Sequence, residues 1–253
     1  MRLRLFVLSM VCALGPVGLN SASAQRVASI QSPARPFGLP VYGPVMECAS
    51  DARSQDFYVN YMPDFLKIID ENLSDNVELK GVSGFKLDAS RLFLRTPSDR
   101  NIRIYFLFEG ADFHNTVGFS WTPAGATTPG APTLLFPDAT IKVGNNRANW
   151  EPLKCGDFVE IGLGDRGYQL DLFLISDGVN GGKHWFWNDS HKNADSLQHV
   201  VAFMLPGTPF ILIGFEDILR GGDLDYNDAL FVIDIGQINA NDLDEDDEST
   251  LPH

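Results

Sequence analysis

Positive charge is scarce in this sequence, and so are long apolar runs. The chain has 19 Lys and Arg residues against 33 Asp and Glu residues, which gives a formal net charge of -14. Such a surface repels the phosphate groups of nucleic acids and of anionic lipids. After residue 24, no apolar stretch approaches the roughly 20 residues that a membrane span requires. We therefore expect a soluble protein that binds no nucleic acid, does not insert into a membrane, and is compatible with cations as partners.

Cysteine is also rare, with three in 253 residues. The first, Cys12, lies in a sequence typical of a secretion signal, where Arg2 and Arg4 precede a mostly apolar run over residues 5–19. The small residues Ala22-Ser23-Ala24 then fit a signal peptidase site. We expect residues 1–24 to be removed as a signal peptide. The mature chain would then be secreted, periplasmic or displayed at the cell surface.

Removal of the signal leaves two cysteines, Cys48 and Cys155. An even pair in an exported protein predicts a disulfide, because the compartments outside the cytoplasm are oxidising. The bond would close a loop of roughly 100 residues and contribute about 4 kcal/mol in the chain-entropy model. Two buried free thiols are the alternative, since the sequence does not show the geometry.

The remaining chain reads as one helix followed by many strands. Residues 25–40 contain three prolines and predict a linker or an extended arm. A short helix is predicted to begin near Pro63. Acidic residues and apolar residues at helical spacing follow this proline. Behind the helix, about nine or ten short β-branched or aromatic runs predict an all-β fold, an antiparallel β-sandwich of the jelly-roll type, over residues 41–238. Residues 239–253 are strongly acidic and predict a disordered tail.

Two of the expected strands alternate clearly enough to predict their faces. In each strand, every second side chain should lie on the same face, which packs against the facing sheet. In residues 102–108 the shared face consists of Ile102, Ile104, Phe106 and Phe108, and in residues 229–235 it consists of Ala229, Phe231, Ile233 and Ile235.

The most unusual stretch is Gly214–Ile235, which contains six acidic side chains, one Asn and a Gly-Gly pair. The acids lie mainly on the connection between two expected strands, where Gly221-Gly222 allows the chain to fold back tightly. Oxygen ligands at every second position can converge on one point, and a dication removes the repulsion between them. We therefore predict a Ca²⁺ site with the ligands Glu216, Asp217, Asp223, Asp225, Asn227 and Asp228, and with Glu109 as a possible additional ligand from another loop.

Other cations and a plain turn explain the pattern less well. The D-x-D-x-N start matches an EF-hand, but Asp228 stands where that loop requires Gly, and Asp234 lies in a strand pattern. Mg²⁺ prefers few protein ligands and many waters, and Zn²⁺ would require His or Cys beside the acids. The remaining alternative is a solvated turn, since Asp and Asn are common turn residues.

The same residues carry a family resemblance. The segment GFEDILRGGDLDYNDALFVI resembles the F-E-D-x(3)-G-G-D-x-D-Y-N-D-x-x-F signature of the bacterial family named domain of unknown function 4114. Three shorter segments between about Ile102 and Asp234 resemble other parts of the family in the same order. They are Glu109-Gly110-Ala111 with Asn115 and Gly118, the turn CGDFVEIG, and Asn193, Asp195, His199 and Val200. The resemblance implies an exported or cell-surface bacterial protein, often beside adhesion modules, and no established reaction.

The pattern and the resemblance together favour a non-enzymatic calcium-binding β-sandwich domain for surface adhesion, with a glycan or a protein as its ligand. Trp185 and Trp187 offer aromatic rings that could stack on a sugar, although core packing explains them as well. The first alternative is a polysaccharide-acting hydrolase that uses the carboxylates as acid and base. A metal would hold those carboxylates ionised, which is the wrong state for a general acid. The second alternative is a structural protein of the envelope or matrix.

Overall fold

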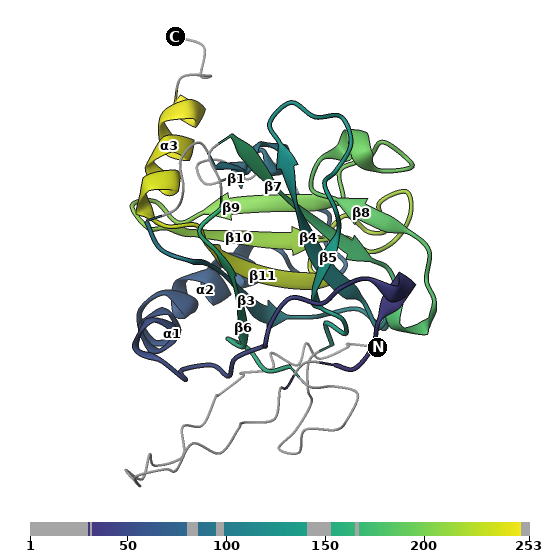
Figure 1. The fold of residues 1–253 in the computed structure, drawn as a ribbon, viewed down its shortest axis with the longest axis horizontal. Coiled ribbons are helices and arrows are strands. Elements are labelled where there is room, and N and C mark those ends of the chain that lie inside the picture. The colour runs from purple at the N-terminus through teal and green to yellow at the C-terminus, as the bar shows by residue number, and fades with distance from the viewer. Residues whose placement is uncertain are drawn as a thin grey trace, which may run out of the picture.

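Short β-branched and aromatic runs form eleven strands in the part of the chain that this computed structural model describes. The strands lie in two antiparallel sheets packed face to face (Figure 1). The antiparallel β-sandwich expected from the sequence is thus confirmed, while its jelly-roll variant stays a prediction. The expected signal peptide lies outside the described residues, which are 30, 32–79, 86–94, 99–140, 153–164 and 167–248.

The larger sheet has six strands in the order β1-β9-β10-β11-β3-β6. Neighbouring strands are antiparallel throughout, and Phe215 at the end of one central strand pairs with Ala229 at the start of the next. The strands of this sheet are β1 (Lys86–Leu87), β9 (Val200–Met204), β10 (Phe210–Phe215), β11 (Ala229–Asp234), β3 (Ile102–Phe108) and β6 (Phe158–Gly162).

The smaller sheet is built around β7 and β4, which pair along eight residues. The expected arm reaches its edge, where the Leu134 N–H donates to the Pro40 carbonyl at 2.9 Å and the Tyr42 N–H donates to the Leu134 carbonyl at 2.8 Å. The strands of this sheet are β2 (Phe93–Leu94), β7 (Tyr168–Ile175), β4 (Thr116–Pro123), β5 (Thr133–Phe136) and β8 (Trp185–Trp187), of which β8 pairs with β7.

Alternating side chains of both sheets fill the space between them. The predicted inner faces are confirmed for all four residues of 229–235 and for Ile102, Ile104 and Phe106. Phe108 differs, because it lies at the end of β3 and is 37% exposed. The opposite face of β11 is also buried, with Leu230 and Val232 packed under helices on the outside of the larger sheet.

The covering helix begins earlier than the sequence analysis predicted. It comprises α1 (Ala52–Asp56), a π-turn at Phe57–Tyr61 and α2 (Met62–Asn72), which lie beside the larger sheet in Figure 1. A capping box explains the early start, because the Asp51 side chain accepts from the Ser54 N–H and the Ser54 hydroxyl accepts from the Asp51 N–H. The π-turn precedes Pro63, which has no N–H to donate to a preceding carbonyl.

A second helix replaces part of the disordered tail predicted for residues 239–253. Helix α3 (Gln237–Glu248) follows β11 directly, and Ala240 and Leu243 are buried against the core between the sheets. Apolar residues three positions apart share one helix face, so this short pattern suffices to attach the helix despite the acids around it. Among the described residues, no helix has the length and apolar composition needed to cross a bilayer.

The disulfide predicted between Cys48 and Cys155 is not formed in the structure. The two segments are nevertheless neighbours, because the Cys48 N–H donates to Asp157 Oδ1 at 3.0 Å. A Cβ added at Gly156 would lie 2.4 Å from the Cys48 Sγ. The thiol of Cys155 is buried and donates to the Met62 sulfur at 3.4 Å. A disulfide requires matched Cβ positions as well as proximity, and sequence spacing does not specify them.

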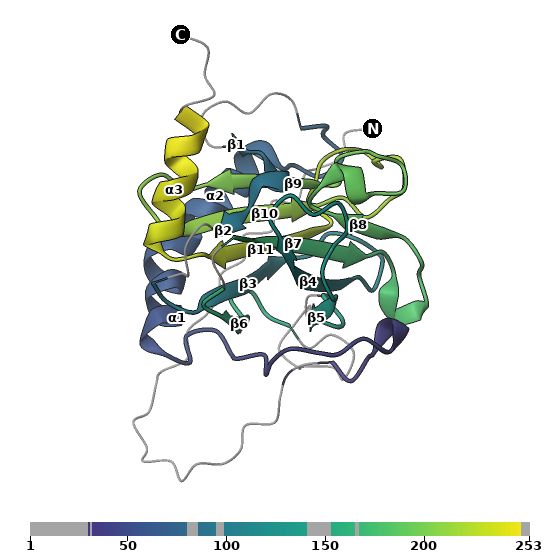
Figure 2. The ribbon, with the colours of Figure 1, turned by 45° about the horizontal axis from the view of Figure 1, so that its top comes forward.

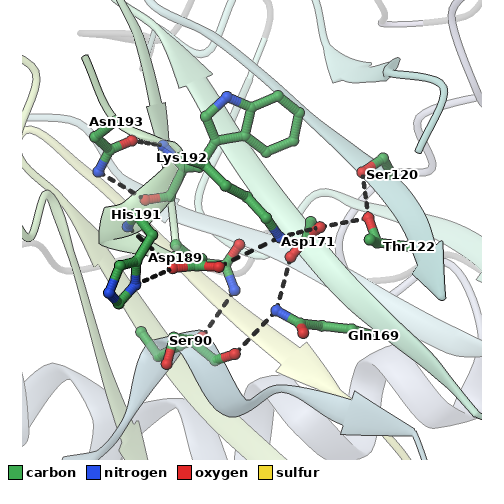
Figure 3. Close-up of polar contacts among 12 residues, drawn as sticks. Ser90, Ser120, Thr122, Gln169, Asp171, Asp189, His191, Lys192 and Asn193 are labelled. Atoms are coloured by element: carbon green, nitrogen blue, oxygen red, sulfur yellow. Dashed lines mark hydrogen bonds and ion pairs between the residues drawn. The ribbon is translucent and has the colours of Figure 1, made fainter. Parts of the chain in front are cut away.

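A buried ion pair lies on the outer side of the smaller sheet (Figure 3). The Lys192 Nζ donates to Asp171 Oδ2 at 2.7 Å, and the two side chains are 4% and 0% exposed. Thr122 Oγ1 donates to the same carboxylate oxygen, and Gln169 Nε2 donates to the other at 2.8 Å. These bonds compensate a buried charge that would otherwise be costly. They fix the turn Ser190–Lys192 on β7, directly before the loop that reaches the acidic bend.

Candidate metal centre

The acidic bend, residues 216–228, connects β10 to β11 at the end of the sandwich opposite α3 (Figures 1 and 2). Its backbone curls because five of its residues adopt positive φ, namely Arg220, Gly221, Gly222, Leu224 and Tyr226. A Cβ at Gly222 would lie 2.0 Å from Glu216 Oε1, so a side chain there would displace the Glu216 carboxylate. The bend therefore folds back over the Glu216 carboxylate, which explains the Gly-Gly pair.

The curl brings five of the six predicted ligands into two groups. In each group, one oxygen from each carboxylate lies within 4.8 Å of the others. The first group is Glu216, Asp223 and Asp225, and the second is Glu216, Asp217 and Asp228. Asp223 is exposed and Asp228 is half-buried, whereas the other three side chains are buried. The side chains thus converge on common centres and do not splay into water.

Glu216 is common to both groups and is 1% exposed. Its Oε2 accepts a hydrogen bond from the Leu224 N–H at 3.1 Å. Its Oε1 is buried and has no hydrogen-bond partner. Burial, followed by the charges of Asp228, Asp223 and Asp225, raises the pKa of Glu216 to about 9. An unpartnered buried carboxylate oxygen is costly, and a bound cation is one way to satisfy it.

Asp217 and Asp228 are held against each other on one side of Glu216. The Asp217 N–H donates to Asp228 Oδ2 at 2.8 Å, and Asn115 Nδ2 donates to Asp217 Oδ2 at 2.6 Å. Burial and then the Asp217 charge raise the pKa of Asp228 to about 7. Burial also raises the pKa of Asp217, against the effect of its hydrogen bonds. Bringing these groups together therefore favours protonation unless positive charge is supplied.

Asp225 is fixed by donors from two segments. The N–H and the Nδ2 of Asn227 donate to its two oxygens at 3.1 and 2.9 Å, and the Asn76 N–H donates to Oδ2 at 2.8 Å. Burial raises its pKa. Asn227 is itself anchored, because its Nδ2 also donates to the Leu73 carbonyl at 3.2 Å. The amide nitrogen of Asn227 thus positions Asp225 in this structure.

Two neighbouring loops brace the bend through residues that the family resemblance marked but that were not predicted as site residues. In the first loop, Asn115 binds Asp217 through Nδ2 and accepts the Asp177 N–H on Oδ1 at 3.0 Å. In the second loop, Asp195 Oδ2 accepts the Arg220 N–H at 2.8 Å and lies 3.0 Å from His199 Nε2. These hydrogen bonds, against an opposing effect of burial, lower the pKa of Asp195 to about 2.

Besides Asn227, three predicted residues lie outside the two groups. Glu109 is buried beside the bend, where the next residue, Gly110, donates its N–H to the Asp228 carbonyl at 3.3 Å, but it belongs to neither group. Trp187 is buried, and its ring centroid lies 4.9 Å from that of Phe173. Trp185 is half-buried at 4.8 Å from the same ring. The packing interpretation of the two tryptophans therefore describes this structure better than a sugar-stacking surface.

The five carboxylates of the two groups could hold a metal ion. In the described part of the chain, neither Lys nor Arg forms an ion pair with any of the five, although ion pairs occur elsewhere. The groups contain no His and no Cys, and oxygen-only donor sets suit Ca²⁺, Mg²⁺ or Mn²⁺ better than Zn²⁺.

Comparison with known proteins bears on the same region. Neither a curated protein nor a solved structure matches the chain significantly. The segments near Glu109 and Cys155 that resembled the family fall outside the matched part. Residues 165–236, which include the second bracing loop and the whole acidic bend, match the family model described as Domain of unknown function (DUF4114).

Proposed function

We propose that the chain is a non-enzymatic domain whose acidic bend binds Ca²⁺, and that the bound ion organises a ligand-binding surface. The observation that carries the proposal is the buried, unpartnered Oε1 of Glu216, a residue whose carboxylate is grouped with four others. Calcium suits the site better than Mg²⁺, because Ca²⁺ accepts many protein oxygens in irregular geometry whereas Mg²⁺ retains several waters.

The role of the ion follows from what the bend touches. The bend joins β10 to β11, and its acids bind the loop that carries Asn115 and the segment that carries Asn76. Its main chain binds the Asp195 side chain of a third loop. A cation held by the acids would therefore tie together segments that are far apart in the sequence, and chelation would loosen this end of the sandwich.

A surface at this end would suit a protein or glycan ligand. Three bulky apolar side chains are exposed in the bend and its bracing loops: Ile218 is 49%, Leu197 is 42% and Phe113 is 40% exposed. Exposed apolar side chains can contribute to a binding surface where they form a contiguous patch. Export of the chain and an adhesive role at the cell surface belong to this same proposal, and a structural role in the envelope or matrix is its variant.

Thermal unfolding with and without Ca²⁺ tests the proposal. At about 100 times the dissociation constant, calcium should stabilise the protein by about 2.7 kcal/mol. For a domain of this size, this corresponds to a rise in Tm of about 5–10 °C. The variant Asp225→Asn should respond much less, whereas Asp70→Asn, the same change at an exposed position on α2, should respond like the unmodified chain. A Tm that neither calcium nor chelator changes would refute the proposal.

One observation favours the hydrolase alternative. A carboxyl with a pKa of about 9, Glu216, lies beside other carboxylates, and a protonated and an ionised carboxyl together form the acid–base pair of glycosidases. Turnover of a polysaccharide by the calcium-free protein, and its loss in a folded Glu216→Gln variant, would support this function. Binding on a glycan array without turnover would support the binding domain.

A further inference from the structure

The carboxylates of the acidic bend form two groups, and this division bears on how many ions the bend holds. Around one Ca²⁺, ligand oxygens at about 2.3–2.6 Å from the ion lie within roughly 5 Å of one another. Asp223 and Asp225 satisfy this condition with Glu216, and so do Asp217 and Asp228, but the five do not form one group. As the side chains stand, a single ion fits either group, whereas the five carboxylates together do not meet the spacing that each group meets.

The charge of the bend also favours more than one ion. Five ionised carboxylates carry five negative charges, and no Lys or Arg of the described residues pairs with them. One dication would leave three negative charges in a site where three of the five side chains are buried. Two dications would leave one, which is a much smaller cost for a buried cluster.

Glu216 lies where a shared ligand is required. It belongs to both groups, and its Oε2 accepts a hydrogen bond from the Leu224 N–H. Its Oε1 is buried and unpartnered, next to the backbone of Gly222. A carboxylate has about four lone-pair sites, so after one N–H contact it retains enough sites for two cations.

We propose that the acidic bend binds two calcium ions bridged by the Glu216 carboxylate. The inner ion lies with Asp217 and Asp228, and the outer ion lies with Asp223 and Asp225. This inference rests on the proposed calcium function and adds the number of ions and their ligands. The outer site includes the exposed Asp223 and exchanges its ion with solvent more readily than the inner site does.

Counting bound calcium tests the inference. Equilibrium dialysis of the full chain against Ca²⁺ alone should give two ions per chain at saturation. Asp223→Asn should weaken the outer site at least tenfold and leave the inner site unchanged. Because Asp223 is exposed, this change should not affect the fold. Asp217→Asn should weaken the other site, and Glu216→Gln should weaken both. Asp70→Asn, the exposed control, should still bind two ions.

The possible failures differ from one another. One ion per chain, lost equally in the Asp223→Asn and Asp217→Asn variants, would overturn the bridged pair but leave calcium binding intact. No bound calcium in the unmodified chain would overturn both proposals. Two ions whose affinities do not change in the Glu216→Gln variant would refute the bridging role of Glu216. Circular dichroism of each variant separates loss of a ligand from loss of the fold.

Discussion

Calcium-free protein should lose stability as the pH rises from about 6 to about 9, whereas calcium-loaded protein should not. Without a cation, the folded state holds Glu216 with a pKa of about 9 and Asp228 with a pKa of about 7. The unfolded chain has ordinary values, 4.5 and 3.8. Between the unfolded-state and the folded-state pKa of each group, folding therefore takes up protons. The stability that these groups contribute at low pH is lost as the pH rises through the folded-state pKa values.

The magnitude follows from the pKa of Glu216. Each pH unit between the unfolded and the folded pKa costs about 1.4 kcal/mol per proton, so Glu216 alone sets an upper bound of about 6 kcal/mol. The bend is open to water at Asp223, and rearrangement there will reduce the cost. We expect a loss of about 2–3 kcal/mol from pH 6 to pH 9. Asp217 and Asp225 act in the same direction, since their pKa values are also raised.

Urea unfolding of metal-depleted protein at three pH values, with and without saturating Ca²⁺, measures this effect. Calcium should flatten the pH dependence, because it holds the carboxylates ionised in the folded state. Glu216→Gln removes the main titrating group and should flatten it without calcium. A calcium-free stability that is constant or rises toward pH 9 would refute the electrostatic reasoning, and so would a Glu216→Gln variant with the same slope as the unmodified chain.

Three further predictions concern Asn115, which contacts the site, and two residues elsewhere in the sandwich. Lys192→Met leaves the Asp171 carboxylate buried without its ion-pair partner. The free energy of unfolding, measured with denaturant, should fall by about 3–5 kcal/mol. A fall of less than about 1 kcal/mol would contradict a stabilising ion pair. Asn115→Ala removes the hydrogen-bond donor to Asp217 and should weaken calcium binding about 10- to 100-fold. Titration calorimetry measures this affinity. An unchanged affinity would show that the Asn115 contact does not support the site. Trp187→Ala should lower the free energy of unfolding by about 3–5 kcal/mol, because the ring is buried. Loss of glycan binding with unchanged stability would instead identify Trp187 as a sugar contact.

Local patterns were enough to predict the class of fold. Period-two alternation in residues 102–106 and 229–235 placed their apolar side chains on the inner faces, since a strand can bury only every second residue against the facing sheet. Local patterns were not enough at the helices. The capping box at Asp51 is a weak signal without acidic residues behind it, and the two apolar residues that attach α3 lie among a run of acids.

The sequence by itself also determined the acidic bend, because the acids and the Gly-Gly pair are contiguous and repel one another unless something compensates them. Only the tertiary structure decided how they are grouped: positive φ values in the bend divide the acids around Glu216, and Asn76, Asn115 and Asp195 reach them from other segments. Such contacts join residues up to 149 positions apart. They depend on which loops the strand order brings to the same end of the sandwich, and no local spacing records that order.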